Sequence, residues 1–352
     1  MGCDLGDLTE PKTVSFDDLS NKILAVDAYN TLYQFLSSIR QADGTPLMDT
    51  KGRLTGHLTG LFYRSIKWLE AGIKPVFVFD GKPPELKSDT LNKRRERKKE
   101  AKKKMEKALD EGDEEAARRY AQQTSKLTPE MASHAKSLLD ALGIPHIQAP
   151  SEGEAEAADL VKRNIAWAAA SQDFDSLLFG SPRLLRNLST TGRRKMPRKN
   201  EYIQIHPELI ELSSLLSTQK LNQKQLIWLG ILSGTDFNKG IYGIGPKKAL
   251  KLVNKAKSFK EIISNLPESA REKKTEEGEI EGIENWEEIE KFFLFPPTTK
   301  TTKLEFSPPD EKKTISLLVD EFDFSHERVE RTLSSLIKKQ KEECGQTKLG
   351  DW

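Results

Sequence analysis

Seven acidic residues lie at five separate places along the chain, and most of them follow apolar runs or adjoin small residues. Like charges that come close together raise one another's pKa values unless cations neutralise them. Mg²⁺ favours carboxylate oxygens as ligands, and two such ions about 4 Å apart can activate water and stabilise the leaving oxygen of a phosphodiester. If the fold brings the acids together, they predict a metal site suited to phosphodiester hydrolysis. The seven are Asp27, Asp80, Glu152, Glu154, Asp173, Asp175 and Asp236.

The same acids also have a local interpretation. Glu152 and Glu154 follow Pro150 and Ser151, where acids favoured by the dipole of a helix start are common. Asp-x-Asp pairs are equally common on solvated loops. The spacing alone leaves both interpretations open. The five histidines show no spacing that indicates a Ser-His-Asp or Cys-His arrangement.

The elements that must position the acids are short apolar runs that end at them. Runs at residues 23–26, 76–79 and 165–170 suit buried parallel strands. Helical patterns at 56–72, 129–142 and 153–162 separate them. This alternation predicts an α/β fold with a mainly parallel, twisted sheet flanked by helices. Ligands of such sheets collect beyond the carboxyl ends of the strands, where the acids fall.

The composition agrees with a folded intracellular protein. The 352 residues are 36% apolar and 31% charged, with a net charge of only +2. The two cysteines, Cys3 and Cys344, cannot form a disulfide framework or a Cys-rich zinc site. No run reaches the length of a membrane helix, and the start lacks a signal-peptide pattern. We therefore expect a soluble, cytoplasmic protein with no membrane partner.

Charge is bunched along the chain. Residues 87–107 hold eleven Lys or Arg against four acids, and the range 82–132 is interpreted as a largely helical insertion between sheet elements. An exposed charged helix is the alternative, and a phosphate backbone would also suit the basic run. A second basic cluster is expected on a surface loop, and residues 271–290, with nine Glu, in a solvated variable connection. The basic cluster is Arg193, Arg194, Lys195, Arg198 and Lys199.

The stretch from Gly240 to Ala249 reads GIYGIGPKKA. Its glycines can form a tight hairpin with backbone N–H groups pointing outward, and Pro246 suits a helix start. Such a turn binds a phosphate without reading bases, and Lys247 and Lys248 add charge. An ordinary connecting turn is the alternative. Elsewhere, Tyr33 and His57 could contact a base or lie in the core.

Four motifs in this order identify a family. They are VFDGKPP at 78–84, APSEGEA at 149–155, SQDFDSLLFG at 171–180 and the hairpin at 243–249. Together they resemble the flap endonucleases, which are structure-specific 5′ nucleases. The likeness runs from Gly2 to about Gln340, which we expect to form a single nuclease domain over 1–340. A hairpin element would lie at about 220–260 and a flexible tail at 341–352.

The resemblance implies a role for each of these residues. The insertion would form a helical arch, and the acids would hold two Mg²⁺ ions, replaceable by Mn²⁺. Asp27, Asp80, Glu152 and Glu154 would serve one side, with Asp173, Asp175 and Asp236 on the other. The remaining residues match contacts to the substrate. Lys87 and Arg94 match contacts to the scissile phosphate, Tyr33 and the amino-terminal Gly2 match contacts near the cut end, and Gly243, Gly245, Lys247 and Lys248 belong to the hairpin that grips the duplex, often with K⁺.

The implied substrate is branched DNA with a displaced 5′ strand, cut near the base of the flap by in-line attack of water. This activity, together with 5′-3′ exonuclease activity, would serve Okazaki fragment processing and DNA repair. A related metal nuclease with another substrate is one alternative, although repair-bubble nucleases carry a longer insertion at 82–129. The other is a non-catalytic DNA-junction or clamp-bound scaffold, which would have no reason to keep seven repulsive acids.

The tail from Gln346 to Trp352 resembles a sliding-clamp-binding motif. Gln346, Leu349 and Trp352 would lie on one side of a short helical turn. The usual pattern has a second aromatic residue after the first, and the sequence ends at Trp352. Because no basic extension follows the motif, an archaeal source fits better than a eukaryotic one.

Overall fold

The computed structural model describes residues 3–41, 45–113, 116, 120, 124, 126–190, 192–195, 201–273, 275, 278–301 and 303–349. Its centre is a 7-stranded sheet in the order β1-β9-β6-β5-β2-β3-β4. The strands from β6 to β4 are parallel, and β9 and β1 complete one edge in antiparallel pairing. The predicted mainly parallel sheet is confirmed. The strands are β1 (Lys12–Thr13), β2 (Ile23–Asp27), β3 (Lys74–Phe79), β4 (His146–Gln148), β5 (Ala168–Ala170), β6 (Arg183–Arg186) and β9 (Glu208–Glu211).

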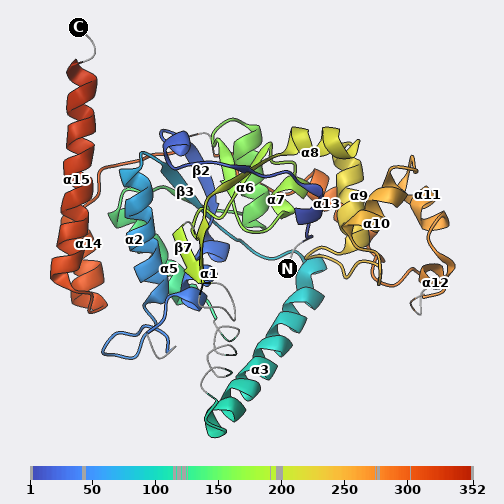
Figure 1. The fold of residues 1–352 in the computed structure, drawn as a ribbon, viewed down its shortest axis with the longest axis horizontal. Helices are drawn as coiled ribbons and strands as arrows, with labels where there is room; N and C mark the ends of the chain where they lie inside the picture. Colours follow the sequence, from blue (N-terminus) through green and yellow to red (C-terminus); the bar gives the residue numbers. More distant parts are fainter. Residues whose placement is uncertain are drawn as a thin grey trace.

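One face of the sheet is covered by the helices drawn at the left of Figure 1. Leu24, Val26 and Phe77 pack there against Phe62 and Leu138 from the helices. Local signals start these helices: Thr128 accepts a hydrogen bond from Met131 N and Pro129 occupies the first turn of α5. The helices are α1 (Ala28–Ser38), α2 (Gly56–Glu70), α5 (Pro129–Ala141), α14 (Glu311–Ile315), the π-helical η4 (Ser316–Glu321) and α15 (His326–Leu349).

The other face is covered by α6 (Gly153–Lys162), where Leu160 and Val161 pack on Ala25 and Val78. Beyond α6 lies a helical lobe with its own core, drawn at the right of Figure 1. The lobe and the short N-terminal helices consist of η1 (Gly6–Leu8), η2 (Asp17–Leu19), α7 (Asp175–Leu178), α8 (Leu212–Gln219), α9 (Gln223–Ser233), α10 (Pro246–Val253), α11 (Phe259–Ser264), α12 (Glu268–Arg271) and α13 (Trp286–Leu294).

The basic insertion leaves the sheet after β3. It begins with η3 (Glu85–Lys87) and continues into the long helix α3 (Ser88–Asp110). Figure 1 shows α3 running away from the body of the molecule, starting between the sheet and the helical lobe. The predicted helical insertion is therefore observed over the described part of 82–132.

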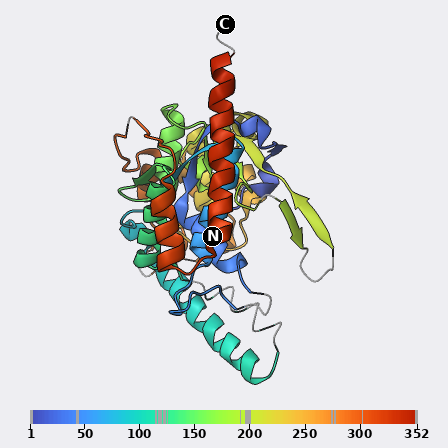
Figure 2. The same ribbon diagram turned by 90° about the vertical axis from the view of Figure 1, so that its left-hand side faces the viewer.

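Three sequence expectations differ from the structure. The basic cluster is not a loop: Gly192–Lys195 forms β7, which pairs with β8 (Tyr202–Ile205) in the projecting hairpin of Figure 2. Arg198 and Lys199 lie outside the described residues. The strand expected at 165–170 is only Ala168–Ala170, because Ile165 and Ala166 close the end of α6 through bonds to Leu160 O.

The acidic segment also differs from expectation. Residues 271–290 are not wholly solvated, because Ile283 and Ile289 are buried and α13 begins at Trp286. In the predicted tail, α15 continues to Leu349 through residues of high helix propensity such as Lys and Gln. Residues 350–352 lie outside the described part. Among the described residues, no helix is long and apolar enough to cross a membrane.

Candidate metal-dependent active site

Three strand ends bring acids to one edge of the sheet. Asp27 is the last residue of β2, and Asp80 directly follows the adjacent parallel strand β3. Asp173 and Asp175 follow β5, the neighbour of β2 on its other side. Since the carboxyl ends of parallel strands meet at one edge, residues distant in sequence share this site. The Asp27 carboxylate also caps α1, accepting from Asn30 N at 3.0 Å.

The start of α6 adds Glu152 and Glu154 to this edge. Gly153 N donates to Asp80 Oδ1 at 2.7 Å, which holds the helix start against the end of β3. The backbone after β3 also lies very close to the backbone before α6, because a Cβ on Gly81 would lie 2.1 Å from Ala149 O. Glu152 occupies the N-cap position but makes no capping hydrogen bond with its side chain. Glu152 and Glu154 thus stand at a helix start, as the local interpretation expects, but Glu152 does not act there as a hydrogen-bonding cap.

Asp236 reaches the same edge from the helical lobe, in the loop after α9. Repulsion links the acids: Asp80 raises the pKa of Asp27, Asp236 raises that of Asp175, and Asp173 raises both. Burial is the larger cause in each case, and the pKa of Asp27 reaches about 8 and that of Asp175 about 7.

Glu154 belongs to the same cluster of acids. Burial, and then repulsion from Asp175, Asp173 and Asp27, raises its pKa well above the ordinary value. Burial likewise raises the pKa values of Asp80 and Glu152. The structure thus brings all seven predicted acids into one electrostatically coupled cluster.

Two cations of the insertion enter the cluster. Lys87 Nζ lies 2.5 Å from Glu152 Oε2 and 3.3 Å from Asp236 Oδ2, and the side chain is buried. Arg94 Nη2 donates to both carboxylate oxygens of Asp236 at 2.7 Å. Although burial acts to raise the pKa of Asp236, these cations hold it below the ordinary value. The base of α3 is therefore anchored directly on the acids.

Three further groups that sequence reasoning missed position the acids. Asn30 Nδ2 donates to Asp173 Oδ2 at 3.0 Å, and Ser171 Oγ donates to Glu154 Oε1 at 2.9 Å. The backbone N–H of Cys3 donates to Asp175 Oδ1 at 3.1 Å. Ser171 stood inside a recognised motif, but the contacts of Asn30 and Cys3 span 143 and 172 residues and have no local signal.

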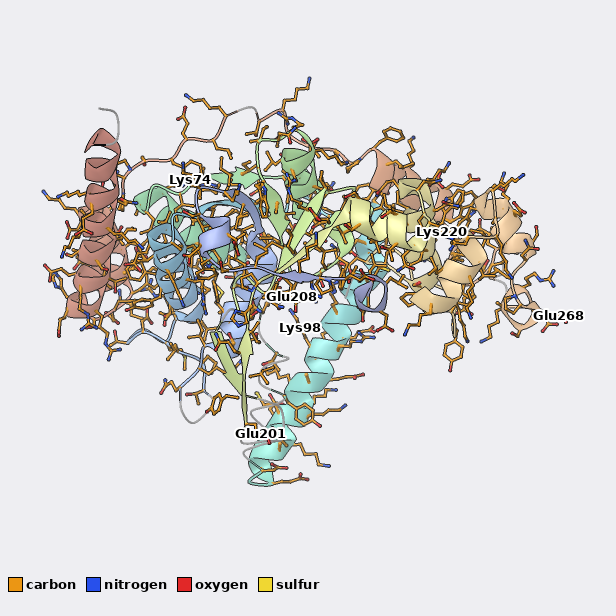
Figure 3. The ribbon with its side chains drawn as sticks, turned by 45° about the horizontal axis from the view of Figure 1, so that its top comes forward. Lys74, Lys98, Glu201, Glu208, Lys220 and Glu268 are labelled. Atoms are coloured by element: carbon orange, nitrogen blue, oxygen red, sulfur yellow. The ribbon has the colours of Figure 1, made fainter. Side chains whose placement is uncertain are left out.

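The aromatic candidates separate clearly. Tyr33, on α1, lies beneath α3, with Lys98 Nζ 4.8 Å from the centre of its ring. Figure 3 labels Lys98 on the side of α3 that faces the body of the molecule. His57 is fully buried in α2 and cannot contact a base. Gly2 lies outside the described residues. These begin at Cys3, whose backbone N–H donates to Asp175.

The predicted hairpin joins α9 to α10. Gly243 has φ +79°, a conformation that L side chains rarely adopt, and no atom lies within 4 Å of a Cβ placed on Gly243 or Gly245. Lys248 Nζ donates to Gly243 O at 2.9 Å, and Lys247 pairs with Asp7 at 2.8 Å. The turn is thus open on its outer side and carries two lysines.

The donor set suits hard divalent cations. Every candidate ligand is a carboxylate oxygen, and the raised pKa values report negative charge that the protein neutralises only in part. In the part of the chain that the structure describes, no three acids converge on a ready-made ion site. Glu152 and Asp236 are instead engaged by Lys87 and Arg94. The donor types fit a hard divalent ion, and two of the seven acids are held by cations of the insertion.

Comparisons with known proteins agree with this geometry. Models of the XPG N-terminal domain and the XPG I-region match residues 5–101 and 143–236. The chain is 53% identical to Flap endonuclease 1 of Staphylothermus marinus, covering 99% of this chain and 98% of the relative. It is 51% identical to Flap endonuclease 1 of Hyperthermus butylicus, with 97% and 96% covered.

Solved structures give the same result. The flap endonuclease-1 from Methanococcus jannaschii superposes with a TM-score of 0.74 at 39% identity, covering 97% of this chain and 100% of that one. The catalytic core of Rad2 in complex with a DNA substrate gives a TM-score of 0.68 at 26% identity, covering 94% and 97%. Fold and site thus define a metal-dependent nuclease of the XPG type. Within that class, the chain belongs to the flap endonuclease family, the structure-specific 5′ nucleases.

Proposed function

We propose that this nuclease cuts branched DNA at the base of a 5′ single-stranded flap, using two Mg²⁺ ions held by the seven acids. One observation carries the proposal: acids from five places in the sequence form a single coupled cluster directly beneath the basic helix α3. Mutual repulsion would destabilise such a cluster in a protein that binds no cations there. A 5′-3′ exonuclease activity would use the same site, in Okazaki fragment processing and DNA repair.

The acids would divide between two ions. Asp27, Asp80, Glu152 and Glu154 would hold one, and Asp173, Asp175 and Asp236 the other. Bound Mg²⁺, or Mn²⁺ in its place, would activate water and stabilise the leaving oxygen. Lys87 and Arg94, once released from Glu152 and Asp236, would lie where a scissile phosphate needs cations. Their present ion pairs with the acids support this role.

Tyr33 and the α9–α10 hairpin would supply the substrate contacts. Tyr33, which lies under Lys98, would stack on the terminal nucleotide, with Gly2 near the same end. The hairpin of Gly243 and Gly245, with Lys247 and Lys248, would hold the duplex through its phosphates, with K⁺ as a possible ligand of the turn.

Cleavage of a labelled 5′-flap duplex tests the proposal. In the presence of Mg²⁺, wild type should cut near the flap base, while Asp175→Ala should bind the DNA and cut at least about 100-fold more slowly, since a ligand is lost. Asp17→Asn, an exposed acid outside the cluster, is the matched control. Equal cutting by wild type and Asp175→Ala would remove Asp175 from the mechanism. Binding without any cutting by wild type would favour the non-catalytic scaffold.

The C-terminal end of α15 would bind a sliding clamp through Gln346, Leu349 and Trp352. Figure 1 shows α15 extending beyond the body of the molecule, which leaves its end accessible to a partner. Deleting residues 346–352 should lower clamp affinity by about tenfold or more, since an apolar anchor is lost, with cutting in the absence of clamp retained. Unchanged clamp binding would refute this assignment.

A further inference from the structure

A small cavity lies beside the acid edge of the sheet, where β2, β5 and β6 meet α1 and α2. Its volume is about 10 Å³, at the lower end of the roughly 10–15 Å³ that one water molecule needs. Val26 and Leu185 form apolar parts of its wall, and Asn30, Trp68 and Ser189 bring polar groups to it. The space is too small for a substrate or a cofactor and suits a single water.

Trp68 brings an unsatisfied donor to this wall. Its side chain is fully buried, and its Nε1 has no hydrogen-bond partner among the described residues. A buried N–H without a partner destabilises the folded protein, because the unfolded chain keeps that group hydrated. Since the indole Nε1 is a donor only, the group that satisfies it must be an acceptor. A water in the cavity that Trp68 lines is such an acceptor.

Asn30 connects the same cavity to the acid cluster. Its Nδ2 donates to Asp173 Oδ2 at 3.0 Å, while its Oδ1 accepts no bond within the described part of the chain. A side-chain amide has one donor end and one acceptor end, so a donor at Oδ1 keeps Nδ2 turned toward Asp173. Ser189 offers a further acceptor, because its Oγ donates to Gln34 Oε1 and keeps its own lone pairs.

We infer that the cavity binds one long-lived water, which accepts from Trp68 Nε1 and donates to Asn30 Oδ1 and Ser189 Oγ. Three hydrogen bonds are the usual number for a buried water. Through this water and Asn30, Trp68 acts as a positioning residue for Asp173. The bridge itself stands on the cavity and the unsatisfied indole, whereas its effect on metal binding rests on the proposed function.

Magnetic resonance of the full-length ¹⁵N-labelled protein tests the bridge directly. The indole N–H of Trp68, assigned by its loss in Trp68→Phe, should show cross-relaxation with a water that stays bound for longer than the protein takes to tumble. Trp228 is the internal control, because its Nε1 donates to Glu290 and its N–H should show no such water. If Trp68→Phe does not fold, substitution of the other tryptophans assigns the same signal by elimination. A resolved Trp68 signal without a bound water would overturn the inference.

Calorimetric titration with Mg²⁺, in the absence of DNA, tests the consequence for the acids. Trp68→Phe keeps an aromatic ring but removes the donor. We expect it to weaken Mg²⁺ binding about fivefold, less than the roughly 10–100-fold typical when a direct partner of a metal ligand is lost, because Trp68 acts through a water and Asn30. Trp286→Phe, which removes an indole stacked on Phe259 in the helical lobe, is the matched control and should leave the affinity unchanged.

A double variant separates positioning from simple packing. Asn30→Ala removes the contact to Asp173, so adding Trp68→Phe should then change the Mg²⁺ affinity by less than about twofold, since the two residues act in series. Independent losses that multiply would show that Trp68 acts through packing alone and would overturn its positioning role. Failure of wild type to bind Mg²⁺ or to cut the flapped duplex would instead reject the proposed function, and the resonance measurement would still decide whether the water is bound.

Discussion

At the scale of single residues, the neighbours of an ionisable group decide its behaviour. Asp175 and Asp236 belong to one cluster, yet burial and then repulsion raise the pKa of the first to about 7, while Lys87 and Arg94 lower that of the second against the effect of its burial. A cluster in which most acids resist ionisation gains when further positive charge arrives. This is the residue-level reason to expect metal dependence.

His57 is a buried ionisable residue outside the acid cluster, and no hydrogen bond from the part of the chain that the structure describes compensates for its burial. It is fully buried in α2, and neither ring nitrogen has a hydrogen-bond partner among the described residues. Burial, and then His134 of α5, lower its pKa from 6.5 to about 4. Between these values the unfolded chain binds a proton that the folded protein does not. Stability is therefore fully present above pH 6.5 and is lost as the pH falls toward 4.

We predict that His57→Leu removes this part of the pH dependence. From pH 7 to pH 4, wild type should lose about 3 kcal/mol more free energy of unfolding than the variant, as the pKa difference implies. Denaturant unfolding at the two pH values measures this. His206→Leu, at an exposed position, serves as the control. Parallel losses in wild type and His57→Leu would show that His57 is not the group that titrates.

At the scale of elements, the base of α3 is attached to the acid cluster. Lys87 of η3 and Arg94 of α3 contact the acids, and Lys98 lies over Tyr33 one turn after Arg94. The helix itself has few apolar residues with which to pack, so these polar contacts fix its base. Its position should therefore respond to whatever neutralises the acids.

We predict that Arg94→Gln loosens α3 and impairs cutting. The substitution removes both hydrogen bonds to the buried Asp236 carboxylate, so amide exchange over the first turns of α3 should become faster. Flap cutting should fall by about 100-fold, the usual effect of losing one charged donor at such a site. Lys102→Gln, farther along the same helix and exposed, should leave both unchanged. Normal exchange with normal cutting would contradict the anchoring role.

At the scale of the whole molecule, the acids lie between the helical lobe and the basic insertion. The helical lobe presents the hairpin at Gly243 and Gly245, and α3 with α5 borders the other side (Figure 1). Asp236 belongs to the lobe, whereas Asp27 and Asp80 belong to the sheet. Contact between lobe and sheet is thus needed to complete the acid cluster.

We predict that Lys247→Gln/Lys248→Gln weakens duplex binding equally for all DNA sequences. Loss of two phosphate contacts should reduce the slope of log affinity against log salt by about 2, because fewer counterions are released. Titrations at several salt concentrations measure the slope. Lys220→Gln, on the end of α8 in the same lobe, is the matched control. An unchanged slope would remove the two lysines from the duplex interface.

Much of this protein could be inferred from its sequence. The buried strands that end at Asp27 and Asp80 are visible as apolar runs, because a parallel strand is covered on both faces. The start of α6 and the α9–α10 hairpin follow from Pro, Gly and capping residues. These are local signals, and they sufficed to name all seven acids and the family.

Other features have no local signal. The short strands β4 and β6 depend on pairing with partners distant in the sequence, and the bond of Cys3 to Asp175 crosses 172 residues. The cavity beside Trp68 exists only because α1, α2, β2, β5 and β6 meet there.

The seven acids show the same division between local and tertiary information. Their identities and the chemistry open to them were determined by the sequence, since residue type sets charge and ligand preference. Only the tertiary structure decided that they share one edge and that Lys87 and Arg94 engage two of them. It also decided that burial raises the pKa values of Asp27, Asp80 and Asp175. Proximity and burial arise from chain segments far apart in sequence, so no local pattern can contain them.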